Sequence, residues 1–258
     1  MDESYQEYIN RVARLTLPSA CALQLQGIQQ SPKFVDGKPV SFPGYSLITP
    51  PAAEDNANEK FYRQIETLQQ QLSNNLGKDF FIPLPKSSFH FTLADLIWDE
   101  TYRQVVKDNP DFDRQLQQEV AASISDYKAE SEERAISWQL WGVITRPRAI
   151  MACLVPKDQG SYEAVVKLRR ALYQNRDIIG LGIEQQYDLT AHITLGYFDR
   201  IPDSINRDRI CIVLSQINDR LVESQLPEFT IKQAQLRKFE DMIQYNRESD
   251  WAVVNFGS

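Results

Sequence analysis

The segment Phe89-His90-Phe91-Thr92-Leu93 has a close counterpart in the second half of the chain, Ala191-His192-Ile193-Thr194-Leu195. In both segments apolar and polar residues alternate with a period of two, which is typical of a β-strand with one buried face. Residues i and i+2 of a strand point to the same face of its sheet. Each segment is therefore expected to present an imidazole and a hydroxyl side by side, and the pair suggests one site that is built twice around a single ligand.

These two histidines are the only ones among the 258 residues. One interpretation is structural, with each imidazole buried in a strand and bonded to a neighbouring hydroxyl. For a single segment we would favour that interpretation. The second segment, with its matching flanks, favours acid–base chemistry instead, because histidine is the side chain whose charge changes near neutral pH.

The chain is acidic, with a net charge of −7 and a pI of about 5.0, and 42% of its residues are hydrophobic. This composition can build the core of one large domain or of two lobes around a cleft. No block of Lys and Arg stands out, so extended binding of nucleic acid is not expected. A small anionic ligand in a local basic pocket remains compatible with the charge.

Three cysteines, Cys21, Cys153 and Cys211, lie far apart, without the spacing of a zinc site or of a disulfide framework. This pattern favours a reduced, cytoplasmic setting. The acidic residues at the start of the chain do not resemble a signal peptide, and no apolar stretch approaches the length of a membrane span. We therefore expect a cytoplasmic protein without membrane binding, metal or cofactor.

The clearest helical pattern is an apolar stripe from Phe61 to Leu76, which Gly77 ends. A second stripe, from Phe112 to Tyr127, follows Asn109-Pro110. An N-terminal helix over residues 1–20 is expected to close at Pro18, and residues 30–44 are expected to form a loop with several turns. Further helices are expected at about 161–175 and around 210–221, and strands at 45–48, 136–145, 148–155, 229–237, 241–246 and 251–256.

Each half of the chain shows the same order, namely a strand or loop, a helix, the histidine strand, a helix and a hairpin. This order predicts an α+β fold of two pseudo-symmetric lobes around a central cleft, each lobe a small antiparallel sheet backed by helices. We expect a single bilobal domain over residues 1–258. Its parts are an extension of helix and loop over 1–44, a lobe carrying His90 over about 45–156, and a lobe carrying His192 over about 157–258, with exchange of strands between the lobes left open.

Paired His-x-Thr strands in two similar lobes resemble the two-histidine (2H) phosphoesterase superfamily, which includes the LigT-like RNA 2′,3′-cyclic phosphodiesterases. A longer resemblance, over roughly residues 33–200, reaches a little-studied bacterial branch of unknown function. Its segments are Lys33-Phe34, Asp36-Gly37, Phe42-Pro43-Gly44, Pro85, Ser88 to Thr92, Arg103, Leu168-Arg169-Arg170 and Ala191 to Tyr197. Two positions depart from the branch, since Tyr45 stands where it tends to have Asn and Ala191 where it tends to have Phe. The resemblance implies metal-free chemistry, with His192 as base and His90 as acid.

Opening a five-membered cyclic phosphate requires a base that activates water on one side of phosphorus and an acid that protonates the departing ribose oxygen on the other. His90 and His192 can supply one neutral and one charged ring. Thr92 and Thr194 can donate hydrogen bonds to the nonbridging oxygens, where negative charge develops. These four side chains are the expected catalytic residues.

Further contacts with the substrate are expected from one cation and from aromatic rings. Arg103, Arg148 and Arg146 are candidates for the cation near the phosphate, and the alternative for each is a solvated surface charge. Tyr45 and Tyr197, ahead of Trp141, are candidates to stack on a base. Their alternative is packing in the core, which is the usual place of aromatic residues on strands.

The sequence thus favours a metal-independent phosphoesterase that opens the 2′,3′-cyclic phosphate of a nucleotide or short RNA end. A first alternative is the same chemistry on ADP-ribose cyclic phosphate or a signalling oligonucleotide. A second alternative is a non-catalytic protein that binds a nucleotide or RNA in the cleft. Two complete His-x-Thr pairs favour an enzyme, because a protein that only binds has no need of two titrating groups.

Overall fold

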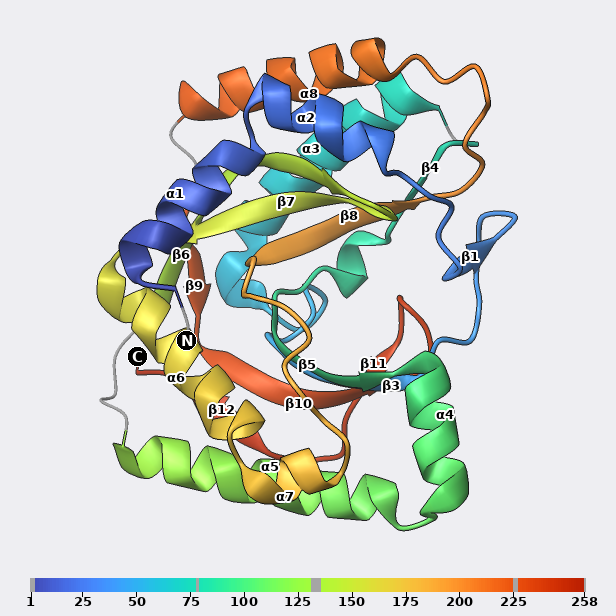
Figure 1. The fold of residues 1–258 in the computed structure, drawn as a ribbon. Helices are drawn as coiled ribbons and strands as arrows, with labels where there is room; N and C mark the ends of the chain where they lie inside the picture. The colour runs from blue at the N-terminus through green and yellow to red at the C-terminus, as the bar shows by residue number, and fades with distance from the viewer. Residues whose placement is uncertain (1–2, 78, 131–135, 225–226, 258) are drawn as a thin grey trace.

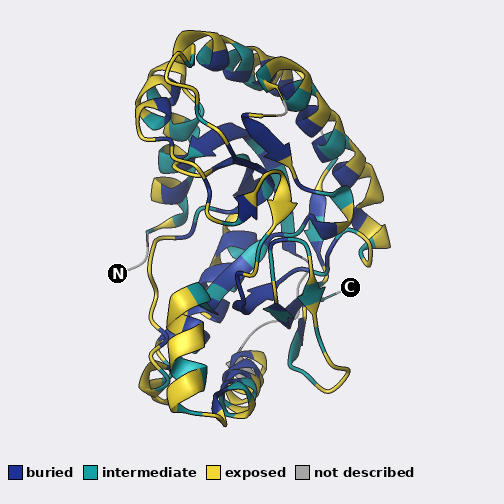
Figure 2. Cartoon of the chain, turned by 90° about the vertical axis from the view of Figure 1, so that its right-hand side faces the viewer, coloured by how far each residue is buried: buried dark blue, intermediate teal, exposed yellow. Residues whose placement is uncertain are grey.

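The computed structural model describes residues 3–77, 79–130, 136–224 and 227–257. Two five-stranded sheets face each other, and helices cover their outer sides (Figure 1). The strand pairs in both sheets are antiparallel. Burial follows these layers, since the sheets are mostly buried while the outward faces of the helices are exposed (Figure 2). The expected α+β class with antiparallel sheets and helices is confirmed.

The sheet that carries His192 has the strand order β4-β8-β7-β6-β9. Its strands are β4 (Phe81–Pro83), β8 (His192–Phe198), β7 (Ala149–Pro156), β6 (Ile136–Arg146) and β9 (Phe229–Ile231). The helices on its outer side are α1 (Tyr5–Leu15), α2 (Pro18–Gln26), α3 (Glu59–Leu76) and α8 (Arg207–Val222) (Figure 1).

The second sheet has the order β11-β10-β3-β5, and β12 also pairs with β10. Its strands are β11 (Tyr245–Asn246), β10 (Gln233–Phe239), β3 (Gly44–Ile48), β5 (Thr92–Trp98) and β12 (Val253–Asn255). The helices near it are α4 (Asp99–Asp108), α5 (Phe112–Glu130) and α7 (Arg176–Gly180), while α6 (Gln159–Tyr173) contacts strands of both sheets. Two short strands, β1 (Phe34–Val35) and β2 (Lys38–Pro39), form a separate hairpin, and Asn56–Asn58 and Lys86–Ser88 form single helical turns.

Each sheet takes strands from both halves of the chain. The hairpin of β6 and β7 pairs with β8, although the expected division near residue 156 assigns it to the lobe of His90. In return, β10 and β12 from the last part of the chain join β3 and β5. Strands are therefore exchanged between the two halves of the chain. A boundary near residue 156 does not separate the sheets, because strands before and after this residue pair with each other in both sheets. The pseudo-symmetry of the two lobes remains a prediction.

Several expected elements are confirmed. Helix α3 ends at Leu76, and Gly77 follows at φ 85°, a conformation that glycine adopts without steric cost. The apolar stripe of α5 is buried, namely Phe112, Leu116, Val120, Ile124 and Tyr127. Helices α6 and α8 and strands β3, β6 and β7 lie where the pattern predicts them.

The single N-terminal helix expected over residues 1–20 is wrong. The structure has two helices there, and Pro18 is the first residue of α2. Proline is favoured at that position because the N–H that it lacks would have no partner in the helix. Helices α4 and α7 and strand β4 were not predicted from the sequence. The strand expected over 229–237 is divided at Lys232 into β9 and β10. Among the helices in the described ranges, none combines the length and apolar character needed to cross a membrane.

Candidate active site

The two imidazoles are anchored in the same way. The Nδ1 atom of His90 lies 2.7 Å from the carbonyl oxygen of Ser88, and the Nδ1 atom of His192 lies 2.6 Å from that of Thr190. A carbonyl oxygen can only accept, so Nδ1 carries the proton in both rings. In the neutral rings, Nε2 is then the nitrogen with a free lone pair, which is the arrangement that a base needs.

Exposure alternates along both His-x-Thr segments. His90, Thr92, His192 and Thr194 are partly exposed, whereas Phe91 and Ile193 between them are fully buried. The apolar members thus anchor each segment in the core, and the polar members reach an accessible surface. The positive charge of His192 also acts on the His90 ring, so the two imidazoles lie within electrostatic range of each other.

A bulge in β8 turns Tyr197 to the same side as His192 and Thr194. On β7, Met151 and Ala149 are two residues apart and share a face, and they oppose Thr194 and Tyr197. Opposed residues of an antiparallel pair share a face, so the extra residue in β8 places Tyr197 beside the catalytic candidates.

Two irregularities in β5 likewise turn Asp95 to the same side of the sheet as Thr92. Ile48 and Ser46 share a face of β3, and they oppose Thr92 and Asp95. The Asp95 carboxylate accepts a hydrogen bond of 3.0 Å from the Ser46 hydroxyl, and its charge acts on the His192 ring. Asp95 is therefore a site residue that strict alternation along the strand does not reveal.

The two histidines differ in their electrostatic surroundings. Burial lowers the pKa of His90 to about 4, and the charges of His192 and Arg237 act in the same direction. Burial also lowers the pKa of His192, and Arg146 and Lys33 add to that effect, but the carboxylate of Asp95 opposes it. Among the described residues, a carboxylate therefore favours the protonated form of His192, whereas the charges that act on His90 favour its neutral form.

Tyr245 covers one side of His90. The ring centroids lie 4.3 Å apart. Burial raises the pKa of the Tyr245 phenol, and the charges of Tyr197 and Asp95 act in the same direction. The position of β11 depends on Arg237, which donates to the Tyr245 carbonyl and forms an ion pair with Glu54. No sequence pattern marks Tyr245, because its contact with His90 arises only when β10 and β11 join the sheet of β5.

The N-terminal helix α1 supports the segment that holds His192. Arg11 donates to the Leu189 carbonyl and to the Thr190 hydroxyl, and Arg146 donates to the same hydroxyl over 3.1 Å. The Tyr8 hydroxyl donates to the Leu154 carbonyl and accepts from the Ala191 N–H. The residues immediately before His192 are therefore fixed by side chains from the expected N-terminal extension.

The other residues predicted to contact the substrate either lie away from the two histidines or already interact with other side chains of the protein. Tyr45 is 0% exposed and packs against Tyr102 and Trp251, so it belongs to the core and does not line an open wall. Arg103 on α4 is exposed and donates to the Ser41 carbonyl and hydroxyl.

Arg148 is exposed in the tight turn between β6 and β7, where its carbonyl accepts from the Phe198 N–H. Trp141 is partly exposed at the bulge of β6. Tyr197 is 7% exposed, and its ring is covered by Phe34 and Lys33. Among the interactions found in the described ranges, none joins Arg103, Arg148 or Trp141 to either histidine.

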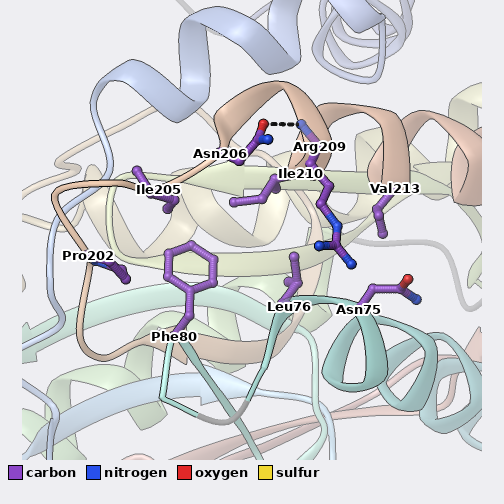
Figure 3. A pocket seen from close by; sticks show the side chains of 9 residues that line it. All are labelled: Asn75, Leu76, Phe80, Pro202, Ile205, Asn206, Arg209, Ile210 and Val213. Carbon is purple, nitrogen blue, oxygen red and sulfur yellow. Dashed lines mark hydrogen bonds between the residues drawn. The ribbon is translucent and has the colours of Figure 1, made fainter.

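A separate hollow of about 180 Å³ lies between α3, α8 and the loop before α8 (Figure 3). Its lining residues are Asn75, Leu76, Phe80, Pro202, Ile205, Asn206, Arg209, Ile210 and Val213. None of them is a predicted site residue, so this hollow is not the candidate active site. Within the part of the chain that the structure describes, no group of three or more His, Cys, Asp or Glu side chains is arranged to hold a metal.

Comparison with solved structures identifies the fold class. The chain is similar to ATU0111 from Agrobacterium tumefaciens strain C58, a conserved protein of unknown function, with a TM-score of 0.57 at 15% identity over 84% of this chain and 90% of that one. This likeness shows a shared fold. The chain is also similar in structure to LigT of E. coli complexed with ATP, with a TM-score of 0.42 at 12% identity over 84% of this chain and 99% of that one.

A further similar structure is TT0787 of Thermus thermophilus, with a TM-score of 0.42 at 15% identity over 76% of this chain and 87% of that one. Scores at this level carry no conclusion beyond the likeness itself. No family model matches the sequence. A search of curated proteins likewise finds no match.

Proposed function

We propose that the chain is a metal-independent phosphoesterase that opens the 2′,3′-cyclic phosphate of a nucleotide or a short RNA end. The observation that carries the proposal is the matched pair of imidazoles, each fixed through Nδ1 to the carbonyl two residues earlier. Each leaves Nε2 for proton transfer and has a partly exposed threonine two residues further on. A structural histidine in a strand has no need of this duplicated arrangement.

The electrostatic difference between the rings supports one of the two possible assignments of the proton-transfer roles. His90, whose pKa the charges of His192 and Arg237 lower, is the base that takes a proton from water as its oxygen attacks phosphorus. His192, beside the carboxylate of Asp95, is the acid that gives its proton to the ribose oxygen as the P–O bond breaks. This assignment is the reverse of the one that the family resemblance implies, and the reason is the negative charge of Asp95.

Thr92 and Thr194 donate to the nonbridging oxygens in this scheme, where charge increases in the transition state. Arg146 is the arginine of the three candidates that lies near His192, and it fixes Thr190. The ligands in LigT structures, ATP, 3′-AMP and NADP+, are nucleotides, the ligand class proposed here. The proposal for this chain rests on its own site and not on those complexes.

The test is turnover on a panel of 2′,3′-cyclic mononucleotides, short RNAs with cyclic phosphate ends and ADP-ribose cyclic phosphate. His90→Ala and His192→Ala should each lower the rate by roughly 10²–10⁴, the usual effect of removing a general acid or base. Activity should persist in EDTA. Near-normal turnover by either variant would contradict the two-histidine mechanism, and binding of the panel without any turnover would support a non-catalytic nucleotide-binding protein instead.

A further inference from the structure

Lys33 has an unusual environment at the start of the β1–β2 hairpin. Its ammonium lies over the rings of Phe42 and Tyr197, at 4.6 Å and 5.1 Å from their centroids. None of the ion pairs found among the described residues includes Lys33. Asp36, the acidic residue of the same hairpin, pairs with Arg200 instead. Lys33 is thus a partly buried cation that two aromatic rings hold in place, and within the described residues no carboxylate is found in an ion pair with it.

The ammonium of Lys33 lies on the side of the sheet where the catalytic candidates are. The bulge in β8 turns Tyr197 to the face of His192 and Thr194, and Lys33 sits over the Tyr197 ring. Its charge lowers the pKa of His192, which places it within electrostatic range of that ring. A cation without an acidic partner beside an imidazole raises the local affinity for an anion.

We propose that Lys33 binds a nonbridging oxygen of the substrate phosphate, next to the point where Thr194 donates. This proposal rests on the phosphoesterase function proposed above and adds Lys33 to the site residues expected from the sequence. An ammonium has three N–H donors, so contact with two ring faces leaves it able to donate to an oxygen. The rings also restrict the long side chain before the ligand arrives, which reduces the entropy lost on binding.

This arrangement also gives Tyr197 a different role from the expected one. Its ring is covered by Phe34, at a centroid distance of 5.4 Å, and by Lys33. Tyr197 therefore supports the cation and does not offer a free face for stacking on a base. Lys33, supported by Phe42 from the same N-terminal extension, thereby becomes part of the phosphate site.

The experiment uses the two histidine rings as reporters. Because the full chain has only these two histidines, its ring proton spectrum has two imidazole sets, which the His90→Ala and His192→Ala variants assign. Inorganic phosphate is titrated at constant pH into the natural chain and into Lys33→Met, Lys33→Gln and Lys33→Arg. Lys38→Met is the matched control, because Lys38 is an exposed lysine of the same hairpin and its loss changes the net charge equally.

Phosphate should shift the His192 signals in the natural chain. Lys33→Met and Lys33→Gln should weaken phosphate binding roughly tenfold or more, as expected for loss of a charged hydrogen-bond donor. The phosphate affinities of Lys33→Arg and Lys38→Met should stay within about threefold of that of the natural chain, because both variants keep a charged donor at position 33. The His192 pKa should rise in Lys33→Met even without phosphate.

Two outcomes overturn the proposal, and they are distinguishable. If phosphate shifts the ring signals equally in the natural chain and in Lys33→Met, the two-histidine site stands and the role of Lys33 is refuted. If phosphate shifts neither ring in the natural chain, both the role of Lys33 and the proposed phosphoesterase function are contradicted.

Discussion

The rings of His90 and Tyr245 meet at an interplanar angle of 61°, with their centroids 4.3 Å apart. Tyr245 lies in the last part of the chain, and Arg237 holds its backbone through a hydrogen bond of 2.9 Å to its carbonyl oxygen. The buried Arg237 also bonds Glu54 and Gln235. One side of the His90 imidazole is therefore covered by Tyr245, whose backbone Arg237 holds in place.

Replacing Tyr245 by Ala should expose the His90 ring. Burial is the main cause of the low pKa of His90, so admitting water should raise that pKa towards the ordinary value near 6.5. The acid limb of the pH–rate profile should then move to higher pH. Tyr245→Phe keeps the ring and is the control, with little change expected. An unchanged His90 pKa in Tyr245→Ala, measured by NMR titration, would show that the contact contributes nothing to the shift.

The low pKa of His90 predicts a pH-dependent stability. The folded chain binds this proton with a pKa of about 4, whereas an unfolded histidine binds it near pH 6.5. The unfolded state therefore takes up more protons between these values, so this stabilisation is present above about pH 6.5 and is lost as the pH falls towards 4. Because the ring is partly exposed, the loss should be on the order of 1–3 kcal/mol.

Urea unfolding of the natural chain and of His90→Gln at pH 7 and pH 5 measures this contribution. The free energy of unfolding should fall further in the natural chain than in the variant. Titration of carboxylates is common to both proteins and cancels in the difference. An equal fall in the two proteins would mean that His90 titrates normally when folded.

Asp95→Asn tests the assignment of His192 as the acid. The Asp95 charge raises the pKa of His192, so its loss should lower that pKa and move the alkaline limb of the pH–rate profile to lower pH. An Asn oxygen can still accept from the Ser46 hydroxyl, which bonds the carboxylate over 3.0 Å. His90 is the internal reference, because Asp95 is not among the charges that shift it. A move of the acid limb instead would reverse the two roles.

Thr92→Val and Thr194→Val distinguish phosphate binding from structural support. If the hydroxyls donate to the phosphate, each variant should lose about 10²–10³ in kcat, with little change in Tm. Thr49→Val is the control, since the buried Thr49 hydroxyl accepts from the Phe91 N–H over 3.0 Å. That variant should lose about 1–3 kcal/mol of stability by leaving a buried donor unpaired. A large loss of stability with nearly intact kcat in the Thr92 and Thr194 variants would refute their role at phosphorus.

The alternating exposure of the two His-x-Thr segments was predicted correctly because alternation is a local property. The strand expected to carry His90 is wrong in its start, since β5 begins at Thr92 and Phe89, His90 and Phe91 precede it, whereas His192 is the first residue of β8. Apolar residues at odd positions and polar residues at even positions decide the faces of a short strand, whatever it pairs with. Asp95 and Tyr197 break that periodicity, because bulges in β5 and β8 rotate them to the side of the histidines. A bulge depends on the register of the partner strand, which the sequence of one strand does not specify.

Tyr245 and Lys33 were missed as site residues for a different reason. Both reach the histidines from segments far away in the chain, through strand pairing and ring contacts that exist only in the assembled fold. Tyr45 illustrates the opposite error, since its aromatic ring suggested a ligand wall whereas the structure buries it against Tyr102. Long-range packing, and not local propensity, decides these three positions.

Strands β9 and β10 are separated in the chain by Lys232 alone. The two strands end up in different sheets, and β10 lies between β3 and β11. Before residues 229–239 are synthesised, β3 has no partner on that side and β6 lacks β9. Both open edges are closed by this one segment, because β9 pairs with β6 and β10 pairs with β3. A truncation before Phe229 would leave those edges open for aggregation.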